Sequence, residues 1–156
     1  DLYGRYAAAM NAIDYSGALA TVRELCDRTN LYIEESAPWA LAKLAAEAPL
    51  PADAGRAEDS TQQVEGSTPL TEPTPQDRLA FVLYNTLEAI RIMALLFAPV
   101  MPASSAEVFS RLSLKDPATT TDLAQASQWG GLGAGNTITI GEPLFPRFSE
   151  DDLELD

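Results

Sequence analysis

Three consecutive residues, Ala37-Pro38-Trp39, interrupt what otherwise looks like one continuous amphipathic helix across residues 30–48. Proline lacks a backbone donor, fixes its own φ and disfavours the α conformation in the preceding residue, so we expect a corner here. The tryptophan then stands at a helix start, where its ring can project from a rigid base and stack on an unpaired nucleic-acid base. The competing interpretation is that Trp39 fills the core of a helical bundle.

Asn30 is a second candidate for the same site. It precedes Trp39 by nine residues, which is about two and a half turns on helical geometry. Its amide could contact a ligand bound at the tryptophan or hold the corner through a hydrogen bond. From the residues alone we favour the structural hydrogen bond.

The chain lacks the usual residues of a self-contained catalyst. It contains no histidine, which excludes histidine acid-base catalysis, Ser-His-Asp and Cys-His arrangements and histidine metal sites. The single cysteine, Cys26, cannot form an intrachain disulfide and falls on the apolar face of a helix, so we expect a buried, unreactive thiol. The glycine-rich stretch 130–135 lacks the lysine of a phosphate-binding loop. We therefore expect no catalytic residue, metal site or cofactor in this chain.

The charge balance argues against non-specific binding to nucleic acid, because the formal net charge is -13 and the isoelectric point is about 4.2. The acidic residues are concentrated in two segments, however. A reader of a few unpaired bases needs a stacking ring and some hydrogen bonds more than a broad basic patch. The two acidic groups are Asp53, Glu58, Asp59, Glu65 and Glu72, and Glu150, Asp151, Asp152, Glu154 and Asp156.

The periodicity of apolar residues predicts an all-α fold, an antiparallel bundle of four or five helices. We expect helices over residues 2–11, from Asp14 or Ser16 to 36, over 40–48, over 78–98 with Asp77 as the cap, and from Pro102 to 112. A short helix starts within 121–126 and ends at Trp129-Gly130, and we expect Trp129 to cover the core. Residues 137–140 alternate like a strand but have no evident partner.

The domain organisation follows from a change in composition. Residues 49–76 are rich in Pro, Thr, Glu, Gly and Ser and lack aromatic residues, so we expect a disordered insert. The bundle then spans residues 1–148, and 149–156 form an acidic tail. No uninterrupted apolar run of about 18 or more residues is present, so we expect no membrane-spanning helix.

Further residues have open roles. Arg91 and Arg111 are the basic residues best placed to meet a phosphate, and a surface ion pair is the alternative. Leu144-Phe145-Pro146 offers apolar groups that can dock on the bundle or against another domain.

Three stretches resemble the helical anticodon-binding domain of methionyl-tRNA synthetases. The first is Asn30 to Lys43, with Ala-Pro-Trp at its centre. The second combines Leu83 to Ile92 with the Pro-x-x-Pro corner at Pro99 and Pro102. The third is Gly141 to Arg147, which contains Leu-Phe-Pro-Arg. The resemblance covers most of the chain apart from the insert and the tail.

The resemblance implies a function as well as a class Ia synthetase type of fold. It implies recognition of the CAU anticodon of methionine tRNA, with Trp39 stacking on a base, Pro38 fixing its projection and Asn30 nearby. The expected partners are the tRNA(Met) anticodon stem-loop and the catalytic domain of a longer parent, in the cytoplasm and without a membrane. That parent would attach methionine to tRNA with ATP, with Mg and Zn as candidate metal ions, while this fragment performs no chemistry.

One departure from the family pattern limits the expectation. The family also reads the anticodon with an Asn-x-x-x-Arg pair on a helix upstream, and no such arrangement begins this chain. We therefore expect the fragment to start after that helix and to bind tRNA weakly alone. The alternatives are an acidic helical module that docks a protein partner, or the equivalent domain of another class Ia synthetase.

Overall fold

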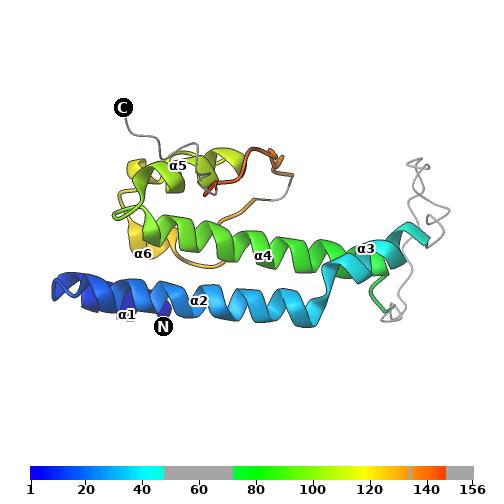
Figure 1. Ribbon diagram of the computed structural model, residues 1–156, viewed down its shortest axis with the longest axis horizontal. Helices are drawn as coiled ribbons and strands as arrows, with labels where there is room; N and C mark the ends of the chain where they lie inside the picture. Colours follow the sequence, from blue (N-terminus) through cyan, green and yellow to red (C-terminus); the bar gives the residue numbers. More distant parts are fainter. Residues whose placement is uncertain (48–71, 134, 147–156) are drawn as a thin grey trace, which may run out of the picture.

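The computed structural model describes residues 1–47, 72–133 and 135–146 (Figure 1). These residues form helices and loops without any strand, which confirms the predicted all-α bundle. Residues 48–71 of the expected insert and all of the expected acidic tail lie outside the described residues. The helices are α1 (Leu2–Asn11), α2 (Tyr15–Ser36), α3 (Pro38–Glu47), α4 (Pro75–Phe97), α5 (Pro102–Arg111) and α6 (Leu123–Ala126), with a 3-10 turn at Pro117–Thr119.

The long helix α4 lies at the centre of the bundle. Helices α1 and α2 form an antiparallel hairpin on one side of it, α5 lies on the other side, and α6 packs beside one end of α4 (Figure 1). Helix α3 continues beyond the end of α2 and packs on the first turns of α4. The α2–α3 corner therefore lies at one end of the molecule, and α4 is the scaffold to which the other elements attach.

The main core forms where α1 and α2 meet α4. Val22 and Leu96 are fully buried, and Tyr6 reaches between the helices so that its hydroxyl donates to the carbonyl oxygen of Leu96 at 2.9 Å. Burial raises the pKa of the Tyr6 phenol, consistent with this apolar setting. Cys26 is half-buried and approaches the sulfur of Met93 at 3.0 Å, as its place on the apolar face predicts.

Helix α4 is long and apolar enough to cross a membrane when length and composition alone are considered. A central bundle helix has the same composition, because it is surrounded by other helices. In this structure α2, α3 and α5 pack along α4, and Glu88 and Arg91 within it are 0% and 4% exposed. We therefore interpret α4 as the core helix of the bundle.

The start of α4 differs from the sequence prediction. The helix begins at Pro75, inside the expected insert, and its cap is Thr74. Asp77 has the reciprocal role, because its carboxylate accepts from the Thr74 backbone N–H at 3.1 Å while its own N–H donates to the Thr74 hydroxyl at 3.1 Å. This capping box satisfies backbone donors that the first turn leaves unpaired.

Removing this cap should destabilise the bundle. Thr74→Ala leaves the Asp77 N–H without its partner, and we expect a loss of about 1 kcal/mol in the free energy of unfolding. Thr74→Ser keeps the hydroxyl and should stay close to the parent protein. Urea unfolding followed by circular dichroism measures both variants, and equal stabilities for alanine and serine would contradict the assignment.

Residues 137–140 do not form the strand that their alternation suggests. The segment runs past the end of α5, where the Thr139 N–H donates to the carbonyl of Arg111 at 2.9 Å. The Ser113 hydroxyl donates to the carbonyl of Thr137 at 2.7 Å. Among the described residues no second extended segment pairs with it, so the alternating pattern does not correspond to a β-sheet.

Candidate nucleic-acid interface

One residue, Ala37, separates α2 from α3. Its backbone is left-handed, with φ 42° and ψ 61°, and its N–H donates to the carbonyl of Ile33 at 3.0 Å. Its own carbonyl accepts from the N–H groups of Ala40 and Leu41 at 2.8 and 3.2 Å, which starts the next helix. Pro38 is the first residue of α3, where a missing donor costs nothing. The structure confirms the predicted corner and shows that a single residue, Ala37, forms it.

Trp39 follows this corner with 63% of its surface exposed. An indole that filled the core would be mostly buried, so the structure contradicts that interpretation. The buried residue in this first turn of α3 is Leu41, which is 8% exposed and anchors the helix. The corner therefore presents a large flat ring to solvent from the start of a fixed helix.

Helix α3 is held against α4 by polar as well as apolar contacts. Leu41, Phe81 and Val82 line a common groove between the two helices. At the far end of α3, the Gln76 side-chain amide donates to the carbonyl of Ala45 at 2.9 Å. Two separate contacts along a ten-residue helix leave little freedom for α3 to pivot, so the direction of Trp39 is set in advance.

Asn30 is exposed on α2, six residues before the end of the helix at Ser36. At 1.5 Å per residue it lies about 9 Å along the axis from that end. Its side chain makes no hydrogen bond with any described residue, so the structure does not support the structural role that we favoured. Its amide remains available to a ligand.

Arg91 is buried, contrary to the expectation that it could meet a phosphate or form a surface ion pair. It is 4% exposed and forms two hydrogen bonds with Glu88, at 2.9 and 2.7 Å. Its Nη1 donates to the carbonyl of Ala126 at 2.6 Å, and its Nη2 also donates to the carbonyl of Gln128 at 2.7 Å. Arg91 therefore holds the segment after α6 onto α4 and cannot reach RNA.

Glu88 completes this buried cluster. Its carboxylate accepts from the backbone N–H groups of Gly130, Gly131 and Leu132, at 2.6, 2.7 and 3.0 Å. Burial alone would raise the pKa of Glu88, but the hydrogen bonds from Arg91 and from the Gly131 and Gly130 N–H groups outweigh it and hold that pKa below its usual value. We call Glu88, Arg91 and the backbone of 126–132 the carboxylate hub.

The glycines of the hub allow the close approach of the backbone. A Cβ added to Gly131 would lie 2.6 Å from the guanidinium carbon of Arg91, and Gly130 has a φ of +96°. Sequence reasoning excluded a phosphate-binding loop in this stretch and missed the hub. A signal was present, because a Glu and an Arg three residues apart interrupt the broad apolar stripe of the long helix α4.

Arg111 does form an ion pair at the surface, as the alternative prediction has it. Its Nε donates to Glu107 at 2.7 Å, and its Nη2 donates to the carbonyl of Glu142 at 2.7 Å. The second bond ties the terminal segment to α5. Two of its five N–H donors therefore serve the protein itself.

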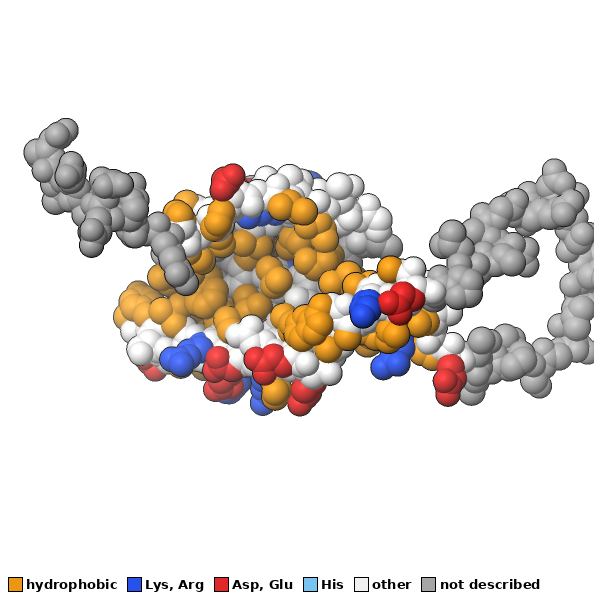
Figure 2. Space-filling view, turned by 45° about the vertical axis from the view of Figure 1, so that its right-hand side comes forward, with side chains coloured by type: hydrophobic (Ala, Val, Ile, Leu, Met, Phe, Trp, Pro, Cys, Tyr) orange, Lys and Arg blue, Asp and Glu red, His pale blue; other side chains and the backbone are white. Residues whose placement is uncertain are grey.

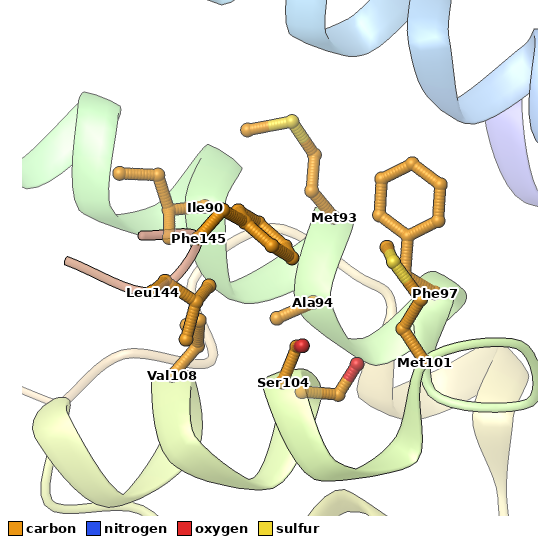
Figure 3. A pocket seen from close by; sticks show the side chains of 10 residues that line it. Ile90, Met93, Ala94, Phe97, Met101, Ser104, Val108, Leu144 and Phe145 are labelled. Atoms are coloured by element: carbon orange, nitrogen blue, oxygen red, sulfur yellow. The ribbon is translucent and has the colours of Figure 1, made fainter. Parts of the chain in front are cut away.

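Leu144 and Phe145 contact the bundle, which is one of the two roles left open for this segment, and Phe145 stays 66% exposed. They line an apolar pocket of about 260 Å³ between α4 and α5. Figure 3 shows the Phe145 ring over this pocket, with Ile90 and Val108 beside it and Met93 and Phe97 pointing toward the α1–α2 hairpin. Hydrophobic side chains also gather in a hollow on one face of the molecule, with charged groups around its rim (Figure 2).

Comparison with known proteins identifies this architecture. Residues 65–155, more than half of the chain, match the family described as the anticodon binding domain of methionyl tRNA ligase. The chain belongs to this family. That membership implies tRNA binding and a soluble protein. The match begins after the Trp39 corner, so the corner lies outside the residues matched by the family.

Relatives of the anticodon-binding domain extend the match to nearly the whole chain. The methionine–tRNA ligase of Lactiplantibacillus plantarum is 35% identical over 148 residues, covering 94% of this chain and 17% of the ligase. The corresponding enzyme of Thermotoga maritima is 31% identical over 149 residues, with coverages of 96% and 19%, and that of Bacillus subtilis is 28% identical over 152 residues, with coverages of 94% and 18%. The chain thus spans about a fifth of the length of these relatives.

Proposed function

We propose that this domain recognises the CAU anticodon of methionine tRNA on behalf of a methionine–tRNA ligase. The observation that carries the proposal is the exposed Trp39 ring on an anchored corner, in a domain of the anticodon-binding family. The indole stacks on an anticodon base, and Pro38 and the left-handed Ala37 fix its direction. Asn30, whose amide is exposed on α2, contributes a polar contact to the same RNA loop.

The chemistry of aminoacylation belongs to another part of the ligase. The domain has no histidine, and within its described residues no group of three or more acidic or cysteine side chains is arranged to hold a metal ion. The catalytic domain, with ATP and its metal ions, attaches methionine in the cytoplasm. The anticodon-binding domain supplies specificity and positions the substrate.

A fluorescence titration tests this function. The chain has two tryptophans, so in the Trp129→Phe variant Trp39 is the only tryptophan reporter. We expect a CAU stem-loop to quench its emission at lower concentration than a stem-loop with a different triplet. Binding by the domain alone should be weak, so the titration needs low salt and high RNA concentrations.

The titration also separates this function from the protein-docking alternative, which the acidic balance of the chain favours. A docking module would show no RNA-dependent quenching. Identical curves for the two stem-loops would contradict anticodon recognition while leaving general RNA binding in place.

A further inference from the structure

The second tryptophan of the chain lies at a separate groove between α2 and α4. Trp129 is 55% exposed, although the sequence analysis expected it to cover the core. The groove has a volume of about 290 Å³, at the lower limit of the ~300–1,000 Å³ typical of small-molecule sites. Its lining is Leu25, Arg28, Thr29, Tyr32, Asn85, Ala89 and Trp129.

The carboxylate hub fixes the position of Trp129. The backbone on both sides of the indole is bonded to buried charges, with the Gln128 carbonyl on Arg91 and the Gly130 N–H on Glu88. A half-exposed aromatic ring is thus held by a fully buried ion pair. Such anchoring lowers the entropy lost when a ligand stacks on the ring.

The polar side chains of the groove suit a nucleotide. The Asn85 amide donates to the Tyr32 hydroxyl at 3.1 Å, which leaves the amide carbonyl and the second amide hydrogen for a base edge. Arg28 is exposed and forms no ion pair with a described residue, so its guanidinium can meet a phosphate. Stacking ring, amide and cation are the three groups that recognise an unpaired base with its phosphate.

This groove is distinct from the Asn30 surface. Asn30 and Tyr32 are two residues apart, which is a rotation of about 200° around α2, so they lie on nearly opposite faces of the helix. Tyr32 and Arg28 precede the last residue of α2 by four and eight residues, which places them about 6 and 12 Å from the corner along the helix axis. Along the axis of α2 the groove is therefore close enough to the corner for one RNA loop to contact both by curving around the helix.

We propose that the Trp129 groove binds a second unpaired nucleotide of the same tRNA loop, outside the triplet that Trp39 recognises. The base stacks on Trp129, Asn85 contacts its edge and Arg28 contacts its phosphate. This inference rests on the proposed function, because it assumes that an RNA loop is bound at the corner. Its contribution is to affinity and not to discrimination between anticodons.

The Trp39→Phe variant tests the groove directly, since Trp129 is then the only tryptophan. At saturation we expect equal quenching of its emission by a CAU stem-loop and by a stem-loop with another triplet, although the second requires a higher RNA concentration. A hairpin with the same stem but a tight tetraloop lacks the unpaired loop bases and should quench little. Quenching by that hairpin would indicate contact with the duplex and overturn the proposal of a stacked base.

Affinity measurements provide the second readout. Trp129→Ala should weaken binding of both stem-loops roughly fivefold to tenfold, and Trp129→Phe much less, because stacking is retained. Arg28→Gln should weaken binding and reduce its salt dependence, whereas Lys115→Gln, a charge-matched control at another exposed cation, should not. Ile140→Ala controls for loss of exposed apolar surface, since Ile140 is 96% exposed.

The outcomes separate the two proposals. RNA binding at Trp39 with no change in Trp129 emission, and no loss of affinity in Trp129→Ala, would overturn the groove and leave anticodon recognition intact. No RNA binding by anisotropy under any condition would overturn both.

Discussion

Replacing Glu88 with glutamine should lower the free energy of unfolding by about 3–5 kcal/mol, the cost of leaving one partner of a buried ion pair unpaired. The amide has a single acceptor oxygen for the three backbone N–H groups that now share two carboxylate oxygens. Its NH2 group would face further donors from Arg91. For a domain of this size the loss corresponds to a fall in Tm on the order of 10 °C, measured by thermal or urea unfolding.

The matched control is Glu107→Gln, which makes the same substitution at an ion pair on the surface. Glu107 pairs with Arg111 at 2.7 Å, but its side chain is 49% exposed. Exposed pairs contribute about 0–1 kcal/mol, because water solvates both charges. If the two variants lost similar stability, the hub would not be the anchor that its geometry indicates.

Lowering the pH should also reduce the free energy of unfolding through the carboxylate hub. The pKa of Glu88 is lower in the folded protein than in the unfolded chain, so its stabilising contribution is complete above the unfolded value of about 4.3. The contribution is lost as the pH falls below that value and through the folded pKa. Glu88→Gln should remove this part of the acid sensitivity, which urea midpoints at several acidic pH values will show.

Replacing Trp39 with alanine should weaken binding of the CAU stem-loop about tenfold to a hundredfold, because base stacking contributes roughly 1–3 kcal/mol per base. The free energy of unfolding should change little, since the ring is 63% exposed and is not part of the hydrophobic core. Trp39→Phe should retain much of the affinity. Fluorescence anisotropy with a labelled stem-loop measures the loss, and thermal unfolding shows that the fold is intact.

Phe145→Ala is the control for this variant. Phe145 is 66% exposed, close to the exposure of Trp39, but it lies over the α4–α5 pocket. We expect its loss to leave RNA affinity unchanged. An equal effect of the two substitutions would indicate that exposed aromatic area in general, and not the corner, drives binding.

The helices could be predicted because local rules specify them. Asp14 caps α2 by accepting from the Gly17 N–H at 2.9 Å, and Pro102 begins α5, both as the sequence indicates. The start of α4 was misplaced because Thr74 and Asp77 both qualify as caps, and only the structure shows that they act together. Choosing between two adjacent caps depends on reciprocal geometry that residue types do not reveal.

Only part of the candidate site could be predicted, and the reason differs from that for the helices. The corner at Pro38 follows from proline's own stereochemistry, but the exposure of Trp39 depends on Leu41 docking on α4. Arg91 was assigned to the surface because its partners, at 126 and 128, are more than thirty residues away in sequence. Contacts of this range depend on the tertiary fold, so the hub and the Trp129 groove become visible only in three dimensions.

The hydrogen bond between Gln76 and Ala45 has a consequence for how this domain tolerates change. It joins the end of α3 to the start of α4, and so it fixes the two points between which residues 48–71 must run. Because the entropy of closing a loop grows only slowly with its length, that connection can lengthen or shorten by many residues at little thermodynamic cost. The Trp39 corner is thereby insulated from length variation in the neighbouring segment, which makes this segment a natural place for insertions.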